Sequence, residues 1–228
     1  MRFTFLNNKK HSTFGLIEKL FFIVLFCSSN LVSAQSDIRS KSYVKFAPFS
    51  LLDIYSGSSL RLGLEYKMNS SLSNYIEIGT YIPYLNFYKN IQGLICKYEI
   101  KYYLKEPLFA DDQYISVEYF IKAQTFTYSD SIHATPDYYK EYKLSKFVNC
   151  FTVKYGILQI KKKLMLDYFV GLGVRFKSVT SGLSDNEYYN IIKDPDSFAE
   201  LTNVYTRERG NHLRINLDIG IKFGYKIK

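Results

Sequence analysis

The last sixteen residues of the chain alternate strictly between apolar and polar side chains. The odd positions from Leu213 to Ile227 are apolar, and the even positions from Arg214 to Lys228 are polar or glycine. Because neighbouring side chains on a strand point to opposite faces, the pattern predicts one long strand with an apolar and a charged face. A helix is excluded, since a period of 3.6 would spread the apolar residues around the axis. Ordinary strands have about 5–6 residues, whereas membrane-spanning strands need about 9–11.

The same alternation predicts seven earlier strands, so the fold class is all-β. In each of them, apolar residues alternate with charged residues, tyrosine or glycine. The expected strands are Ser42–Phe49, Ser59–Met68, Leu72–Ile82, Gly93–Leu104, Gln113–Phe126, Leu144–Leu158, Leu164–Phe176 and Leu213–Lys228.

The expected connections alternate in length. Those after the second, fourth and sixth strands are short, and most of the others are longer: Ser50–Ser58, Pro83–Gln92, Thr127–Lys143 and Lys177–His212. Short turns on one rim and long loops on the other are typical of outer-membrane barrels, whose turns are periplasmic and whose loops are extracellular. The sequence therefore predicts an eight-stranded antiparallel up-and-down transmembrane β-barrel.

Residues 1–34 have the pattern of a secretory signal peptide. Basic residues such as Lys9 and Lys19 precede the apolar run Leu20–Phe26, and Val32–Ala34 supplies small or modest residues before a cleavage site. The run is too short for a membrane helix, which takes about 20 apolar residues. We expect 1–34 to be removed, leaving an outer-membrane barrel domain at 35–228 after export.

The charged face of the predicted strands should point into the barrel lumen. Eight strands leave an interior just wide enough for side chains, and buried charges persist only when they are paired. Because both signs are present, we expect a salt-bridged interior and no water channel, with Glu99 beside Lys97 or Lys122. Glycines on the same face, such as Gly63, Gly171 and Gly220, should make room for the long side chains. The expected inward charges are Arg61, Glu65, Glu77, Lys97, Glu99, Lys101, Glu118, Lys122, Lys154, Asp167, Arg175, Arg214, Asp218 and Lys222.

The composition argues against nucleic-acid binding. The formal net charge is +9, but the charges alternate along strands and do not gather in a helix or an arm. The chain has 22 Tyr, 18 Phe and no Trp. Tyrosine suits the two interfaces of a membrane, where its ring can contact lipid and its hydroxyl can contact water. Cys96 and Cys150 fall on strands that are not neighbours, too far apart for a disulfide, so we expect two free thiols.

With these patterns the chain resembles the small eight-stranded outer-membrane β-barrels of Gram-negative bacteria, the OmpA/OmpX-like group. A small-barrel subfamily has a Val-Lys strand soon after the signal and a late Gly-x-Gly, here Val44–Ala47 and Gly171–Gly173. The resemblance implies outer-membrane localisation and a monomer. The implied partners are membrane lipid, lipopolysaccharide and the barrel assembly machinery, and the external ligand is unknown. Such barrels usually end in an aromatic residue, whereas here Tyr225 lies three residues before the end.

Known site motifs are absent from the sequence, so we expect no catalytic residue, cofactor or metal. There is no Walker loop, dinucleotide fingerprint, zinc cluster or serine-hydrolase elbow. Some eight-stranded barrels modify lipid A with a histidine and a serine. His133 has suitable neighbours for such a set, but a polar loop often contains these residues by composition alone. The neighbours are Ser129, Asp130, Ser131 and Asp137.

The last long loop is rich in both acidic and apolar residues. Acidic oxygens can bind Ca²⁺, although the spacing fits no EF-hand and a solvated loop is favoured. Many apolar residues indicate that part of the loop either folds over the barrel mouth or extends the neighbouring strands as a hairpin. The oxygen-bearing residues are Asp185, Asn186, Glu187, Asp194, Asp196 and Glu200.

Three functions remain open at this point. The leading one is a non-enzymatic outer-membrane barrel with a structural role or a binding role through its outer loops. The second is a soluble exported barrel, like a lipocalin, with its apolar face inward around an apolar ligand. The third is a lipid A-modifying barrel enzyme. The first two differ in which face of each strand points inward, so the positions of Ile219 and Lys222 on the last strand distinguish them.

Overall fold

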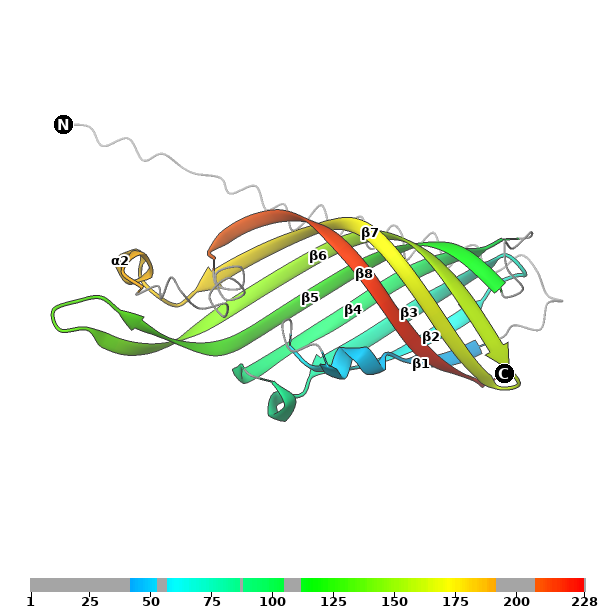
Figure 1. Ribbon diagram of the computed structural model, residues 1–228, viewed down its shortest axis with the longest axis horizontal. Helices are drawn as coiled ribbons and strands as arrows, with labels where there is room; N and C mark the ends of the chain where they lie inside the picture. The colour runs from blue at the N-terminus through cyan, green and yellow to red at the C-terminus, as the bar shows by residue number, and fades with distance from the viewer. Residues whose placement is uncertain (1–41, 53–56, 87, 105–111, 192–207, 228) are drawn as a thin grey trace, which may run out of the picture. The chain divides into compact units, whose positions relative to one another are not determined.

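The computed structural model describes residues 42–52, 57–86, 88–104, 112–191 and 208–227. Eight strands close into a barrel in chain order, each strand antiparallel to its neighbours, and β8 completes the ring against β1 (Figure 1). The predicted eight-stranded antiparallel up-and-down barrel is therefore confirmed. The strands are β1 (Ser42–Phe46), β2 (Ser59–Lys67), β3 (Leu72–Tyr81), β4 (Lys89–Tyr103), β5 (Asp112–Ile132), β6 (Tyr138–Lys161), β7 (Leu164–Ser181) and β8 (Gly210–Lys226).

Within the described residues, three short helical segments lie between the strands. The 3₁₀ helix η2 (Pro48–Leu52) follows β1, and η3 (Pro83–Leu85) follows β3. The α-helix α2 (Asp185–Tyr189) lies between β7 and β8. None of the helices in the described part of the chain is long and apolar enough to cross a membrane. The expected signal peptide at 1–34 lies outside the described residues and stays a prediction.

The two faces of each strand are arranged as the alternation predicts. Leu62, Leu172 and Ile219 point outward and are 54%, 62% and 69% exposed. On the opposite face, Glu99 and Lys222 are buried. The interpretation as a soluble barrel with an apolar lumen is thus wrong about the lumen, because the inward face is the charged one.

The prediction of a loop at Thr127–Lys143 is wrong. β5 continues to Ile132 and β6 begins at Tyr138, and the two strands pair in register up to this point. The polar composition concealed that the alternation continues, with Phe126, Ile132 and Leu144 buried on the inner side. Threonine is compatible with a strand, so the polar outer side does not end the pairing. The result is a long hairpin that projects beyond the other strands (Figure 1).

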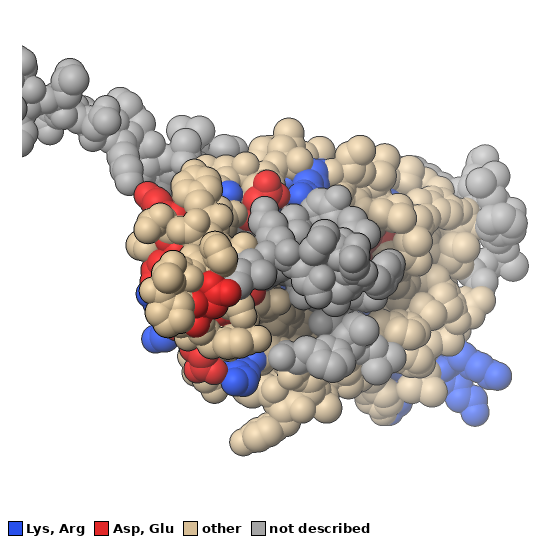
Figure 2. Space-filling model, turned by 60° about the vertical axis from the view of Figure 1, so that its left-hand side comes forward, with Lys and Arg blue, Asp and Glu red and all other residues tan. Residues whose placement is uncertain are grey.

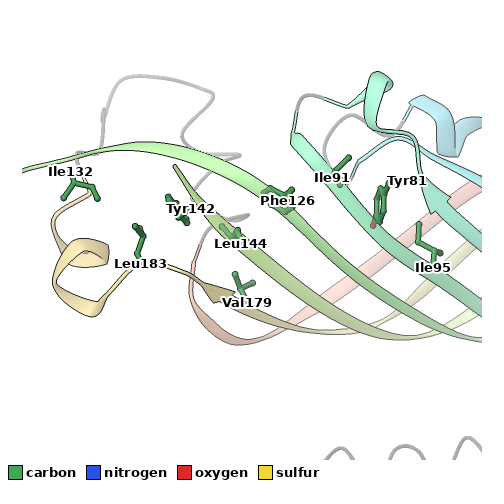
Figure 3. Close-up of a cluster of buried hydrophobic side chains, with 9 residues drawn as sticks. All are labelled: Tyr81, Ile91, Ile95, Phe126, Ile132, Tyr142, Leu144, Val179 and Leu183. Atoms are coloured by element: carbon green, nitrogen blue, oxygen red, sulfur yellow. The ribbon is translucent and has the colours of Figure 1, made fainter. Parts of the chain in front are cut away.

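The segment after β7 crosses the inner face of this hairpin. β7 continues to Ser181, so part of the last predicted loop extends the strands. Gly182 N then donates to Lys143 O on β6 at 2.9 Å, and Ile191 forms a bridge with Ile132 on β5. Leu183, between them, is buried in the cluster shown in Figure 3. Residues 192–207 lie outside the described part of the chain.

Inward-facing glycines give space to large neighbours. At Gly171 the neighbour is a lysine, as predicted, because a Cβ would lie 2.7 Å from Lys154 Cγ. At Gly63 the neighbour is an aromatic ring, since a Cβ would lie 2.3 Å from the Tyr75 hydroxyl oxygen. Cys96 and Cys150, the two cysteines among the described residues, are free thiols, as expected.

Candidate functional site

Four charged side chains from four different strands meet inside the barrel. Lys45 Nζ lies 2.5 Å from Glu65 Oε2 and 2.5 Å from Asp167 Oδ2. Lys101 Nζ contacts the same two oxygens at 3.2 and 2.6 Å. Each carboxylate therefore lies between two ammonium groups, and all four residues are fully buried. This geometry balances two positive and two negative charges, which is the condition for burying them.

Hydroxyl groups complete the surroundings of the two carboxylates. Tyr114 Oη donates to Asp167 Oδ1 at 2.6 Å, and Tyr103 Oη donates to Glu65 Oε1 at 2.6 Å. Ser73 Oγ also donates to Glu65 Oε1, at 2.9 Å. Hydrogen bonds to an ionised carboxylate are about twice as strong as neutral ones, so these donors stabilise the charged form.

A second group of ion pairs lies beside the first. Lys154 Nζ contacts Glu118 at 2.6 Å and Asp218 at 2.7 Å, which connects β5, β6 and β8. Lys222 Nζ lies 3.1 Å from Glu99 Oε2. The prediction that Glu99 lies beside Lys97 or Lys122 is therefore wrong, because its ion-pair partner is Lys222. The strand pattern places residues on a face, but it does not say which strands meet across the lumen.

Sequence reasoning missed Lys45 and the inward hydroxyl groups. Lys45 lies on the face of β1 that the alternation assigns to the interior, but β1 is short and contributes only this one charge. Ser116 Oγ donates to Glu99 Oε1 at 2.6 Å, and Tyr75 Oη donates to Glu77 Oε2 at 2.5 Å. The sequence does contain a signal for these hydroxyl groups, because tyrosine and serine occupy inward positions of the strands alongside the charged residues.

Aromatic rings contact several of the buried ammonium groups. The Nζ atoms of Lys222, Lys101 and Lys154 lie 4.1, 4.2 and 4.3 Å from ring centroids. The rings belong to Tyr75, Tyr114 and Phe169 respectively. A ring face attracts a cation, and the attraction increases when water is excluded.

The ion pairs lie between two apolar layers. At the end with the short turns, the apolar layer includes Leu158 and Met165. At the end with the long hairpin, Ile91, Ile95 and Phe126 form part of a larger cluster (Figure 3). The four charged residues of the first group, which lie between these layers, have no exposed surface. The middle of the interior is thus a packed layer of paired charges.

The hairpin and α2 form a second polar site outside the barrel. Glu187 of α2 pairs with Lys140 of β6 and accepts a hydrogen bond from Tyr138 Oη at 3.1 Å. The same carboxylate completes a capping box with Ser184 at the start of α2. Arg209 Nη1 donates to Asp185 Oδ1 at 2.8 Å. Acidic side chains accordingly gather on this part of the molecular surface, with lysine and arginine beside them (Figure 2).

Glu187 should titrate at unusually low pH. The hydrogen bond from Lys140, followed by those from Ser184, lowers its pKa from 4.5 to about 2. Because the folded pKa is depressed, the stabilisation is present above the ordinary pKa and is lost as the pH falls through about 2. A carbon-13 NMR titration of this carboxyl should have its midpoint near 2. In Lys140→Gln the midpoint should rise toward the ordinary value, and an unchanged midpoint would disprove the role of Lys140.

The candidate catalytic residues do not come together around His133. His133 Nδ1 lies 2.9 Å from Asp137 Oδ1, and both side chains are exposed. Ser129 Oγ instead donates to Glu141, and Asp130 accepts from Tyr142.

The candidate Ca²⁺ ligands also have other partners where the structure describes them. Asp185 pairs with Arg209, and Glu187 pairs with Lys140. Across the described ranges, no three His, Cys, Asp or Glu side chains are grouped so as to hold a metal ion. Asp194, Asp196 and Glu200 lie outside the described residues.

Comparisons with known proteins find a distant structural similarity. No family model matches the chain. No curated protein matches it either. Among solved structures, the crystal structure of a major outer membrane protein from Thermus thermophilus is similar, with a TM-score of 0.36 and 11% identity. The match covers 83% of this chain and 100% of that one.

Proposed function

We propose that this chain is an outer-membrane β-barrel that crosses the bilayer with its eight strands and acts through its structure and its outer hairpin. The observation that carries the proposal is the outward apolar face of the barrel wall. Large apolar side chains point outward and are exposed on every strand from β2 to β8, as Ile78, Leu94 and Leu217 illustrate. Monomeric soluble proteins rarely expose so large a patch. A closed barrel also satisfies its backbone hydrogen bonds internally, which lipid requires.

Exposed aromatic residues lie at one rim of the barrel, where a membrane boundary is expected. Phe49 in η2 and Tyr84 in η3 are exposed on the rim from which the hairpin projects. Aromatic side chains favour the boundary between lipid and water. Because outer-membrane barrels have short periplasmic turns and longer extracellular loops, we assign the hairpin rim to the outside of the cell and the short-turn rim to the periplasm. Membrane lipid, lipopolysaccharide and the barrel assembly machinery are the corresponding partners of a monomer.

The packed interior favours a structural or surface-binding role over transport. An ion that entered the barrel would have to disrupt both apolar layers and the balanced charges of Lys45, Glu65, Lys101 and Asp167. In planar bilayers, the purified barrel should show no stepwise conductance. Regular conductance steps, absent from a mock preparation, would contradict this part of the proposal.

Fractionation tests the location directly. The expressed chain should be recovered with the outer membrane and should migrate differently on gels before and after boiling. Folded membrane barrels show this behaviour because their closed sheet resists detergent. Recovery in the soluble periplasmic fraction, with no shift on boiling, would refute the proposed function. A soluble periplasmic protein and a known barrel serve as the controls in the same cells.

A further inference from the structure

A groove of 490 Å³ lies on the outer surface of β4, β5, β6 and β7. It lies next to the apolar outer face, toward the rim that carries the hairpin. Four hydroxyl side chains line it, and Thr125 Oγ1 lies 3.1 Å from Ser145 Oγ. The other two are Ser178 and Thr180. The groove is on the side of the sheet opposite to the buried ion pairs.

Outward side chains that lie opposite one another on neighbouring strands form rows across the groove. These rows become more polar toward the hairpin. The first row pairs Leu94, Ala123, Phe147 and Ser178 on neighbouring strands, so three of its four side chains are apolar. The second row pairs Thr125 with Ser145 and Ser145 with Thr180. The third row pairs Lys89 with Thr127 and Thr127 with Lys143. A mainly apolar row, a hydroxyl row and a row with two lysines thus follow one another along the strands.

Small side chains and one glycine keep the groove open. A Cβ at Gly93 would lie 2.1 Å from the carbonyl oxygen of Ala123, so only glycine allows this approach of β4 and β5. The pairing of these strands is irregular between Lys89 and Gln92, just beyond this point.

We propose that this groove binds the phosphorylated sugar head of a lipid in the outer leaflet. This inference rests on the proposed function, because a barrel that spans the bilayer places these rows beside the lipid head groups. The three rows match the order of acyl chain, sugar hydroxyls and phosphate in such a lipid. Serine and threonine hydroxyls can both donate and accept hydrogen bonds with a sugar.

Lys143 is the cation assigned to the phosphate. Its side chain is exposed and it follows the hydroxyl row directly. Lys89 lies in the same row, but its Nζ contacts Glu141 Oε1 at 2.9 Å, so that carboxylate offsets its charge. A lysine ammonium group forms charge-assisted hydrogen bonds with phosphate oxygens.

Native mass spectrometry of the full chain in phosphatidylcholine nanodiscs that contain lipid A tests the proposal. The wild-type barrel should retain lipid A in preference to dephosphorylated lipid A and to phosphatidylcholine. Lys143→Gln should weaken this retention roughly tenfold, the loss expected for a hydrogen bond to a charged group. Ser145→Leu should weaken it as well, by filling the groove.

Matched variants on the opposite rim serve as controls. Lys163→Gln removes the same charge and Ser70→Leu adds the same side chain in exposed turns, and both should retain lipid A normally. Equal retention of lipid A with and without phosphate, or equal effects of Lys143→Gln and Lys163→Gln, would overturn the proposal. Gel migration before and after boiling verifies that each variant is folded. A folded, membrane-inserted barrel without lipid preference would refute this inference alone, whereas a soluble chain would refute the proposed function.

Discussion

Replacing Asp167 with Asn is expected to lower the free energy of unfolding by about 3–5 kcal/mol, the usual consequence of removing one partner from a buried ion pair. Asp167 accepts from Lys45, Lys101 and Tyr114, and it has no exposed surface. The amide has nearly the same shape, so the change removes the charge and leaves the packing in place. Two ammonium groups would then share the single carboxylate of Glu65. The midpoint of urea unfolding in detergent micelles measures the loss.

Two further variants show whether the charge is responsible. Glu141→Gln breaks the exposed pair with Lys89, and exposed pairs contribute only about 0–1 kcal/mol, so its midpoint should change little. Combining Asp167→Asn with Lys45→Met removes one of the two stranded cations and should restore part of the lost stability. If the double variant is less stable than Asp167→Asn by the full effect of Lys45→Met alone, the two residues do not interact and the assignment fails.

The wall of the barrel could be predicted from the sequence because a strand repeats every two residues. One property, the alternation of apolar and charged residues, determines both the outward face at Ile219 and the inward face at Lys222. Strand ends were less predictable. β5 continues through polar residues to Ile132, since cross-strand partners on β6 continue the pairing. A polar stretch resembles a loop when its partner strand is not known.

The contacts across the lumen could not be predicted, because they depend on the stagger of the closed sheet. Lys45 and Asp167 come from β1 and β7, two strands apart around the ring, and their meeting depends on how far each strand is shifted. The alternation within a single strand contains no signal for that shift. The same reason explains why Glu99 pairs with Lys222 of β8 and not with a lysine on its own or the next strand.

These contacts also change the expectation for Lys222. From the strand pattern alone, Lys222→Leu is expected to cost less than a charge on the lipid face, provided that its own charge is not essential to the ion-pair network. In the structure Lys222 is buried, contacts Glu99, and lies over the ring of Tyr75. Leucine at this position would leave Glu99 buried without its cation, so the change belongs with Asp167→Asn among the destabilising ones.

Ile219→Arg is expected to destabilise the barrel in lipid by roughly 2–4 kcal/mol, the cost of a guanidinium group on the lipid face at mid-depth. Ile219 lies near the middle of β8, points outward, and pairs with Val170, which is also exposed.

Ile227→Arg is the matched control, because Ile227 faces the same way at the short-turn rim, where its N–H donates to Ser42 O. Near the interface the same substitution costs only about 0–1 kcal/mol. Urea unfolding in lipid vesicles, followed by gel migration before and after boiling, measures both variants. In water both positions would be ordinary exposed sites and an arginine would be tolerated equally at each. A difference that follows depth therefore requires a bilayer around β8, and equal, small effects at 219 and 227 would mean that no bilayer surrounds it.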